Sequence, residues 1–434
     1  MQFLGGIIMT VPIKNKKLRY NLSLLSLGIM GGTIYILMYL RYVFYDQMIT
    51  AFDCTNQQLG MLNTYCSISY FATTIPGAYF ADKFDAKKII VVAISGITAL
   101  TFIYAAFVTS YATAVVIWIL QPIVMMPYWA ALIKYINSLG SAESAGNSYG
   151  TYYLINGLAG AAGNAIPLWV SQHFGFRGAV ISIGLITLLA TILVVLFLDS
   201  EKDKIARGEA MEGDEPIKLK YIKYVVKWPG TYVIFFAYFT TYTLYSNVSY
   251  FNPYLIDVIG IDPDASSVFA VLRNYGAMVV APLGGFMADK VFKSTSKWYI
   301  VAFTISAVMF VVPFTFGPNS NVTLVCIYSV LPSLVVFALY AVTYSIIREL
   351  HIHPTVLGTA VGLGSMSGDL VDGLWPAVFG TWLDAYGNQG YTYIFITLIA
   401  VCVVGILNAL FAMDHNKKCL AGKRKMVIKE IDEK

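Results

Sequence analysis

Long apolar runs, separated by short polar stretches, dominate this chain. A helix needs about 20 apolar residues to cross the hydrocarbon core of a bilayer, and about twelve stretches of the 434 residues provide them. We predict spanning helices at roughly 20–45, 57–80, 88–108, 112–136, 146–170, 177–198, 230–256, 266–288, 298–316, 322–347, 356–382 and 391–412. The expected fold is therefore an all-α membrane protein, because backbone surrounded by lipid must satisfy its hydrogen bonds internally.

The composition supports this reading and excludes several functions. The chain is 58% hydrophobic and 12% charged, whereas soluble chains are about 25% charged. The net charge of +5 lies in short loops between apolar runs, so it does not indicate a nucleic-acid partner. The five cysteines show no metal or disulfide spacing, and no phosphate-binding ATPase loop is found. We expect no cofactor and no metal.

One stretch near the end of the eighth run is echoed in the first half of the chain. Residues 282–290 read Pro-Leu-Gly-Gly-Phe-Met-Ala-Asp-Lys, and residues 76–83 read Pro-Gly-Ala-Tyr-Phe-Ala-Asp-Lys. Asp82 and Asp289 are 207 positions apart, and each ends the second apolar run of a six-run half. The chain is therefore expected to contain two copies of one helical unit.

These loops resemble the signature of the major facilitator superfamily of secondary transporters, Gly-x-x-x-Asp-Arg/Lys followed by basic residues. Gly285 to Lys290 match it well, whereas Ala78 replaces the glycine of the first copy and Asp85-Ala86 replace the usual Gly-Arg. The resemblance covers roughly residues 19–412. It implies twelve helices in two pseudo-symmetric six-helix bundles that alternate access to a central site. The expected gating residues are Asp82, Lys83, Gly285, Asp289 and Lys290; the alternative is loops that only fix orientation.

The predicted organisation has five parts. They are an N-terminal segment (1–19), the first bundle (20–198), a polar linker (199–228), the second bundle (229–412) and a tail (413–434). The linker carries charges of both signs, which we expect to be solvated. Lys and Arg collect on one side of the predicted topology, which places both termini in the cytoplasm, and the composition suits a bacterial inner membrane.

Glycines recur in the fifth and eleventh runs, among them Gly157, Gly160 and Gly163. Small residues let membrane helices approach closely, so we predict close helix packing there.

Arg41, in the first run, is the first candidate for substrate binding. An arginine suits an oxyanion because its fork donates two parallel hydrogen bonds. The stretch Tyr39-Leu40-Arg41 resembles the first-helix site of the organophosphate:phosphate antiporter family. Tyr245 occupies the position that matches that family's second arginine. Gly160 lies near the position of the family's fifth-helix histidine, which this chain lacks. The alternative is that Arg41 lies at the membrane interface.

Aromatic residues are dense on the first, fourth, seventh and tenth helices, which line the cavity in the superfamily that the chain resembles. Tyrosine offers a flat apolar face and a hydroxyl, which suits a sugar-like organic molecule. The alternative for tyrosines near span ends is an interfacial belt. The candidates beside Arg41 and Tyr39 are Gln121, Tyr128, Trp129, Tyr238, Tyr242, Tyr245 and Tyr344, with Tyr35, Tyr42 and Tyr340 as further aromatics.

Three more ionisable residues lie within apolar runs, where charge is costly and usually functional. Asp369 and Asp372 are three residues apart and share a helix face. Two acids away from water repel when both are ionised, which suits one of them for carrying a proton. Arg273 is their expected counter-charge. The alternatives are a structural ion pair for Arg273 and a helix cap near Gly373 for one acid.

The sequence therefore predicts a monomeric secondary transporter, not an enzyme, that moves a small organic solute across the lipid bilayer. An organic anion such as a sugar acid or a sugar phosphate is the favoured substrate. Import, export, coupling to a proton or Na⁺, and exchange all remain open. The alternatives are a multidrug or amphiphile exporter of the same fold, a non-transporting membrane sensor, and a membrane enzyme, for which we find no convincing catalytic set.

Overall fold

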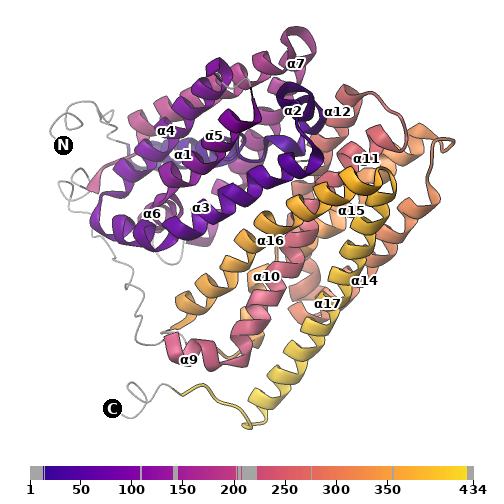
Figure 1. The fold of residues 1–434 in the computed structure, drawn as a ribbon. Coiled ribbons are helices and arrows are strands. Elements are labelled where there is room, and N and C mark those ends of the chain that lie inside the picture. Colours follow the sequence, from indigo (N-terminus) through magenta and orange to yellow (C-terminus); the bar gives the residue numbers. More distant parts are fainter. Residues whose placement is uncertain are drawn as a thin grey trace. The chain divides into compact units, whose positions relative to one another are not determined.

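The computed structural model describes residues 13, 15–107, 110–139, 145–201, 203, 207, 222–274, 276–353 and 356–427, and these form helices and their connections, without a strand (Figure 1). The chain divides into two compact units. Unit 1 comprises Met1–Cys54 and Tyr65–Glu215, and unit 2 comprises Thr55–Thr64 and Pro216–Lys434. The division differs from the predicted boundaries mainly at Thr55–Thr64, which come early in the chain but group with unit 2.

Unit 1 is built from helices joined by short connections. Its elements are α1 (Lys16–Thr33), η1 (Leu40–Tyr42), α2 (Tyr45–Phe52), most of α3 (Asn56–Lys83), α4 (Ala86–Phe107), α5 (Tyr111–Met125), α6 (Tyr128–Asn137) and α7 (Ala145–Phe197). Ser110 and Thr113 form a capping box that starts α5. Helix α7 is interrupted at Gly175, whose φ of 69° favours glycine, and this break separates the predicted spans 146–170 and 177–198.

Helices α1 and α7 pack closely because glycines remove side chains from their interface. A Cβ atom on Gly32 would lie 2.3 Å from the backbone oxygen of Asn156 and 2.7 Å from the backbone nitrogen of Gly160. A Cβ atom on Gly163 would lie 2.6 Å from Ile36. The predicted close packing along the fifth run is therefore confirmed at Gly160 and Gly163.

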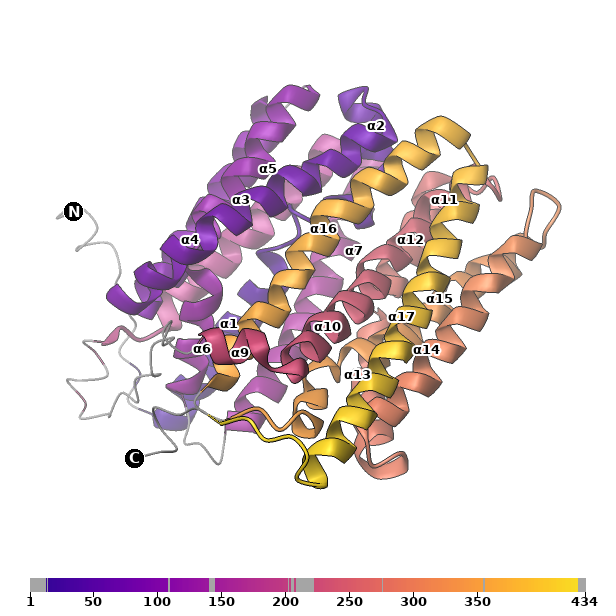
Figure 2. The same cartoon turned by 60° about the horizontal axis from the view of Figure 1, so that its bottom comes forward.

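Unit 2 contains more irregular helical segments than unit 1. Its elements are the start of α3, α9 (Ile222–Lys227), α10 (Pro229–Asn247), η3 (Val248–Tyr250), α11 (Phe251–Asp257), α12 (Pro263–Asn274), η4 (Gly276–Val280), α13 (Ala281–Phe286), η5 (Met287–Val291), α14 (Thr295–Val311), η6 (Val312–Thr315), α15 (Val322–Tyr340), η7 (Thr343–Glu349), α16 (Leu357–Tyr386) and α17 (Gln389–Leu420). Helices α10, α16 and α17 lie side by side (Figure 2).

Six helices in the described part of the chain are long and apolar enough to cross a membrane. They are Ala86–Phe107, Tyr111–Ile136, Thr151–Phe197, Thr295–Thr315, Val322–Glu349 and Gln389–Leu420. Thr151–Phe197 includes the Gly175 break and covers two predicted spans. Other predicted spans are made of shorter pieces; α12, η4 and α13 together occupy the predicted span 266–288.

The first turns of α3 pack against α16 within unit 2. The carboxylate of Asp384 accepts hydrogen bonds from the backbone N–H groups of Asn56 (2.9 Å) and Gln57 (2.7 Å), so it caps the start of α3. A Cβ atom on Gly60 would lie 2.0 Å from the backbone oxygen of Pro376, and one on Gly380 would lie 2.3 Å from that of Asn56. Glycine is required at both places for this approach.

Candidate functional site

Five tyrosines of unit 2 form a continuous cluster, which we call the tyrosine ladder: Tyr238, Tyr242, Tyr245, Tyr340 and Tyr344. Along α10, the ring of Tyr242 stacks 5.4 Å from Tyr238 and 5.7 Å from Tyr245. Tyr340, at the end of α15, stacks 4.4 Å from Tyr245, and Tyr344 of η7 stacks 5.5 Å from Tyr238. The spacing of three and four residues places the α10 rings on one helix face. The structure therefore brings together the four candidates that the sequence indicated in this half, with Tyr340.

A buried carboxylate adjoins the ladder. The hydroxyl of Tyr242 donates a hydrogen bond of 2.7 Å to Oδ2 of Asp372, on α16. Asp372 is 9% exposed, and Asp369, one turn earlier, is half-buried. The α16 backbone comes close to α10 at this level, because a Cβ atom on Gly368 would lie 2.6 Å from the ring of Tyr238. An acid and a phenol that share a proton at a buried position can hold or pass on that proton.

Arg273 is fully buried at the end of α12 and faces α15. Its Nη1 atom donates a hydrogen bond of 2.8 Å to Oγ of Ser329. In the described part of the chain, its guanidinium forms no ion pair with Asp369 or Asp372. The expected role of Arg273 as counter-charge to these acids is therefore not realised in this structure, because Asp372 accepts from Tyr242 and Arg273 lies against another helix.

In unit 1, Arg41 lies in the short helix η1, where the first span is interrupted. Arg41 is buried, with 3% of its surface exposed. The guanidinium carbon lies 5.0 Å from the ring centre of Tyr42, within the range of a cation–π contact. Tyr39 stacks on Tyr42 at 5.2 Å, and Tyr35 lies 6.1 Å from Tyr128.

Three other candidates of unit 1 differ in their surroundings. Gln121 is fully buried, and neither atom of its amide group has a hydrogen-bond partner within the described residues. A buried amide without partners is costly, so this group is available to a polar ligand. Tyr128 is buried, whereas the side chain of its neighbour Trp129 is 49% exposed.

The two signature loops share a glycine that sequence reasoning missed. A Cβ atom on Gly284 would lie 1.8 Å from the backbone oxygen of Ala338, and one on Gly77 would lie 2.4 Å from that of Met126. Both glycines lie five residues before the signature aspartate. Gly285, which the signature emphasises, has open space where a Cβ atom would lie, with no neighbouring atom within 4 Å.

Asp289 of the second signature loop forms an ion pair with Arg348 at 3.2 Å, and both side chains are largely exposed. The next residue, Glu349, accepts hydrogen bonds from both Ser294 and Ser296 side chains and from the backbone of Thr295, at 2.5–3.0 Å. It thereby holds the start of α14. Lys290 is exposed, as is Lys83 in the first loop. The side chain of Asp82 lies outside the described residues.

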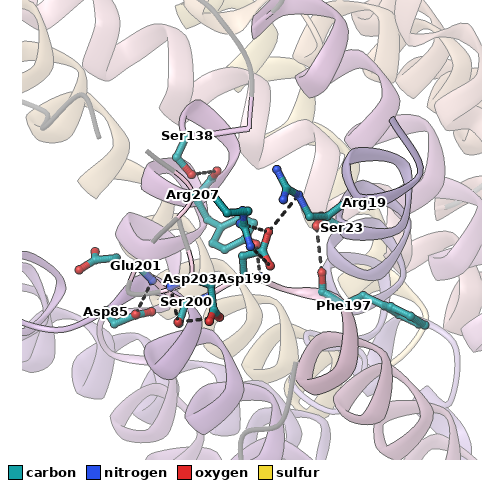
Figure 3. A network of polar contacts seen from close by, with 11 residues as sticks. Arg19, Ser23, Asp85, Ser138, Phe197, Asp199, Ser200, Glu201, Asp203 and Arg207 are labelled. Atoms are coloured by element: carbon teal, nitrogen blue, oxygen red, sulfur yellow. Dashed lines mark hydrogen bonds and ion pairs between the residues drawn. The ribbon is translucent and has the colours of Figure 1, made fainter. Parts of the chain in front are cut away.

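A polar network joins the first signature loop of unit 1 to the linker (Figure 3). We call it the linker network: Arg19, Asp85, Lys134, Asp199, Glu201 and Arg207. Asp199 accepts from Nε of Arg19 at 3.3 Å and from Nη2 of Arg207 at 2.7 Å. The Asp199 side chain is 8% exposed, so the expectation that linker charges are solvated is wrong for this residue. The sequence shows only that Asp199 directly follows an apolar run.

The same network reaches the loop before α4. The backbone N–H of Glu201 donates a 2.7 Å hydrogen bond to Oδ2 of Asp85, and the Glu201 carboxylate pairs with Nζ of Lys134 at 2.9 Å. Asp85 also accepts from the backbone N–H of Lys87 at 2.8 Å. Asp85, which departs from the family signature, thus has a structural role in this chain.

A protein-family model matches this chain twice, once in each sequence repeat. The model of the Major Facilitator Superfamily matches residues 22–236 and again residues 234–425. Among solved structures, a bacterial homologue of the human lysosomal transporter Spinster has a TM-score of 0.71 at 16% identity, covering 93% of this chain and 98% of that one. A D-xylose–proton symporter has a TM-score of 0.69 at 15% identity, covering 92% and 97%. The predicted all-helical, duplicated membrane fold is confirmed.

Three relatives also match over long stretches. Inner membrane protein YihN of Escherichia coli (strain K12) is 27% identical over 385 residues, covering 86% of this chain and 90% of that protein. The probable sulfoacetate transporter SauU of Cupriavidus necator is 26% identical over 391 residues, covering 82% and 85%. The hexuronate transporter of Bacillus subtilis (strain 168) is 24% identical over 251 residues, covering 55% and 57%.

Proposed function

The chain belongs to the Major Facilitator Superfamily, and we propose that it carries a small organic anion across the membrane by alternating access. Members of this superfamily are transporters, so the chain is a transporter and not a membrane enzyme. In a duplicated transporter, two similar halves rock about a site near the middle of the bilayer.

The observation that carries the proposal is the buried position of Arg41 among tyrosines. Placing a cation within a membrane-spanning segment is costly, and residues of this kind are by default functional. The guanidinium beside Tyr42 combines a positive charge with an aromatic face. Gln121 adds an amide with no partner in the described structure. Charge, aromatic surface and amide together suit an anion with a sugar-like or short carbon body.

The names of two relatives indicate the same chemistry. SauU is named for sulfoacetate and the Bacillus protein for hexuronate, and both compounds combine a polar or carbon body with an acidic group. We propose a sugar acid or a sulfonated carboxylic acid as the substrate class. The tyrosine ladder of unit 2 supplies ring faces and hydroxyls for the body of such a molecule.

We propose that Asp372, with Asp369, couples transport to a proton. The Tyr242–Asp372 hydrogen bond provides a buried acceptor next to the ladder. A proton-coupled sugar transporter shares the fold, which supports this choice over Na⁺. We further propose an inner-membrane location with both termini in the cytoplasm, supported by the distribution of Lys and Arg and by the inner-membrane relatives. In this orientation, the Asp289–Arg348 pair is a cytoplasmic gate contact.

The test is uptake of radiolabelled glucuronate and sulfoacetate into liposomes that contain the purified protein, with and without an inward proton gradient. We expect uptake of at least one anion, stimulated by the gradient. Replacement of Arg41 by Lys should lower uptake by about tenfold or more, because an ammonium group cannot make the same bidentate contact. Arg177→Lys is the matched control, since Arg177 is exposed. Transport of lipophilic cations without any anion uptake would contradict the proposal and favour an exporter.

A further inference from the structure

Arg273 is a buried cation whose guanidinium makes one hydrogen bond within the described part of unit 2. Its side chain has no exposed surface, and it lies within the predicted eighth span. A buried charge normally requires an opposite charge or several hydrogen bonds. An arginine cannot avoid this requirement by losing its proton, because it remains charged in proteins.

The contacts of Arg273 leave most of its donors unused. Nη1 donates a hydrogen bond to Ser329, and the Ser329 hydroxyl in turn donates a 2.7 Å hydrogen bond to the backbone oxygen of Cys326. Nε and Nη2 have no hydrogen-bond partner within the described residues. These two atoms form one edge of the guanidinium fork, which is the edge that receives a carboxylate or another oxyanion through two parallel bonds.

Two further unused polar groups lie in the neighbouring sequence. Oγ of Ser333 is buried one helical turn after Ser329 on α15, and it has no partner in the described part of the chain. Nδ2 of Asn274, next to Arg273, is likewise buried and unpartnered among these residues. The atoms without partners at Arg273 and Asn274 are all donors, and the Ser333 hydroxyl can donate, so each of these groups suits a negatively charged ligand.

The helices are irregular where these residues lie. Helix α12 is described as far as Asn274, and from Gly276 to Val280 the backbone forms the 3₁₀ segment η4. Helix α15 contains Pro332 between Ser329 and Ser333. In membrane proteins, interrupted backbone is tolerated where it is buried in protein or lines a cavity, and transporters place binding sites at such interruptions.

We propose that Arg273, oriented by Ser329, is a second anion-binding residue, which receives the acidic group of the transported molecule in unit 2. The inference rests on the proposed function and adds to it a contact in the C-terminal half. Ser329 holds one arm of the guanidinium, and the Nε–Nη2 edge binds the carboxylate or sulfonate. Since the side chain is buried, the anion reaches it only when the helices around it separate during the cycle.

If the role of Arg273 were purely structural, its replacement would change the melting temperature differently. A structural arginine stabilises the protein through its contacts, so its removal lowers the melting temperature. A binding arginine with unused donors costs stability in the absence of ligand. Its replacement by methionine, an apolar side chain of similar length, then leaves the melting temperature of the ligand-free protein unchanged or raises it.

The experiment measures both properties on the purified full-length protein. Binding of glucuronate, sulfoacetate, inorganic phosphate and chloride is followed by calorimetry, and the melting temperature is measured without ligand. The variants are Arg273→Met, Arg273→Lys and Ser329→Ala, with Arg177→Met as the exposed control. We expect Arg273→Met to weaken binding of the organic anion by at least about tenfold without lowering the melting temperature, and the control to match the wild type. Arg273→Lys keeps the charge and should also lose about tenfold, because it loses the fork.

The results separate this inference from the proposed function. If the wild type binds an organic anion and both Arg273 variants bind it equally well, the role of Arg273 is overturned while the proposed function stands. If the wild type binds none of the organic anions, both fall. Loss of phosphate or chloride binding alone, with organic-anion binding intact, also overturns the inference. A fall in melting temperature of Arg273→Met with unchanged affinity of Arg273→Lys identifies a structural residue instead.

Discussion

In unit 1, the loop between α3 and α4 is bound to a segment more than a hundred residues away, because Asp85 accepts from the backbone of Glu201. In unit 2, the matching loop between η5 and α14 is bound to the end of the tenth span, through Asp289–Arg348 and through Glu349. The two loops occupy the same place in the two sequence repeats. Their partners come from different parts of the chain, and their charges differ in exposure.

The difference in exposure separates charges that stabilise the fold from charges that are free to exchange partners. The Asp199 side chain of the linker network is 8% exposed. The side chains of Asp289 and Arg348 are 48% and 66% exposed. A buried carboxylate that loses its partners leaves uncompensated charge, whereas an exposed pair is replaced by water at little cost. The linker network is therefore suited to a permanent role, and the exposed pair to a contact that breaks and reforms.

The largest effect is expected for Asp199→Ala. The substitution removes the buried carboxylate that pairs with Arg19 and Arg207, whose side chains are 13% and 33% exposed, and we expect a loss of about 2–4 kcal/mol in stability. Thermal unfolding of the purified protein measures it, with Asp289→Ala, which removes the acid of the exposed pair, as the comparison. Equal melting temperatures for the two variants would contradict the distinction between the buried network and the exposed pair.

Gly284→Ala should give the next largest effect. Its new methyl group would meet the backbone oxygen of Ala338, which cannot move as a flexible side chain does, and we expect a loss of about 1–3 kcal/mol. Gly285→Ala is the control, because open space surrounds that position. Gly77→Ala tests the same contact in unit 1. If Gly284→Ala and Gly285→Ala unfold at the same temperature, the close approach does not matter for stability.

Glu349→Ala should cost less, about 1–2 kcal/mol, because it removes the carboxylate that holds the start of α14. Glu349→Gln keeps an acceptor and should lose only part of this stability. The comparison is made by thermal unfolding of the two variants beside the wild type. A larger loss for the glutamine variant would show that the group does not act as a cap.

The smallest effect on stability is expected at the exposed pair. A double-mutant cycle with Asp289→Ala and Arg348→Ala should give a coupling of about 0–1 kcal/mol, which decreases as salt is added. Transport is the more sensitive measurement. If this pair belongs to a gate, each single variant changes the uptake rate at nearly constant stability. Unchanged uptake in both variants would leave the pair without a role in gating.

The local patterns predicted most of the fold because they depend on nearby residues. The lengths of the apolar runs predicted the spans. The spacing of Tyr238, Tyr242 and Tyr245 predicted that their rings lie on one face of a helix. The partners of Asp199 and Asp85 could not be predicted, because they depend on how chain segments far apart in sequence meet. The same limit applies to Arg273, for which the sequence suggests Asp369 and Asp372 as partners. Two opposite charges in apolar runs suggest an ion pair, but only the fold shows that Arg273 faces Ser329.

The start of α3 has a mechanical consequence. One continuous helix, Asn56–Lys83, has its first residues in unit 2 and the remainder in unit 1. Asp384 fastens its first turn, and Gly60 allows the backbone of Pro376 to lie against it. The N-terminal end of this helix therefore cannot separate from α16 unless the carboxylate of Asp384 releases the backbone N–H groups of Asn56 and Gln57.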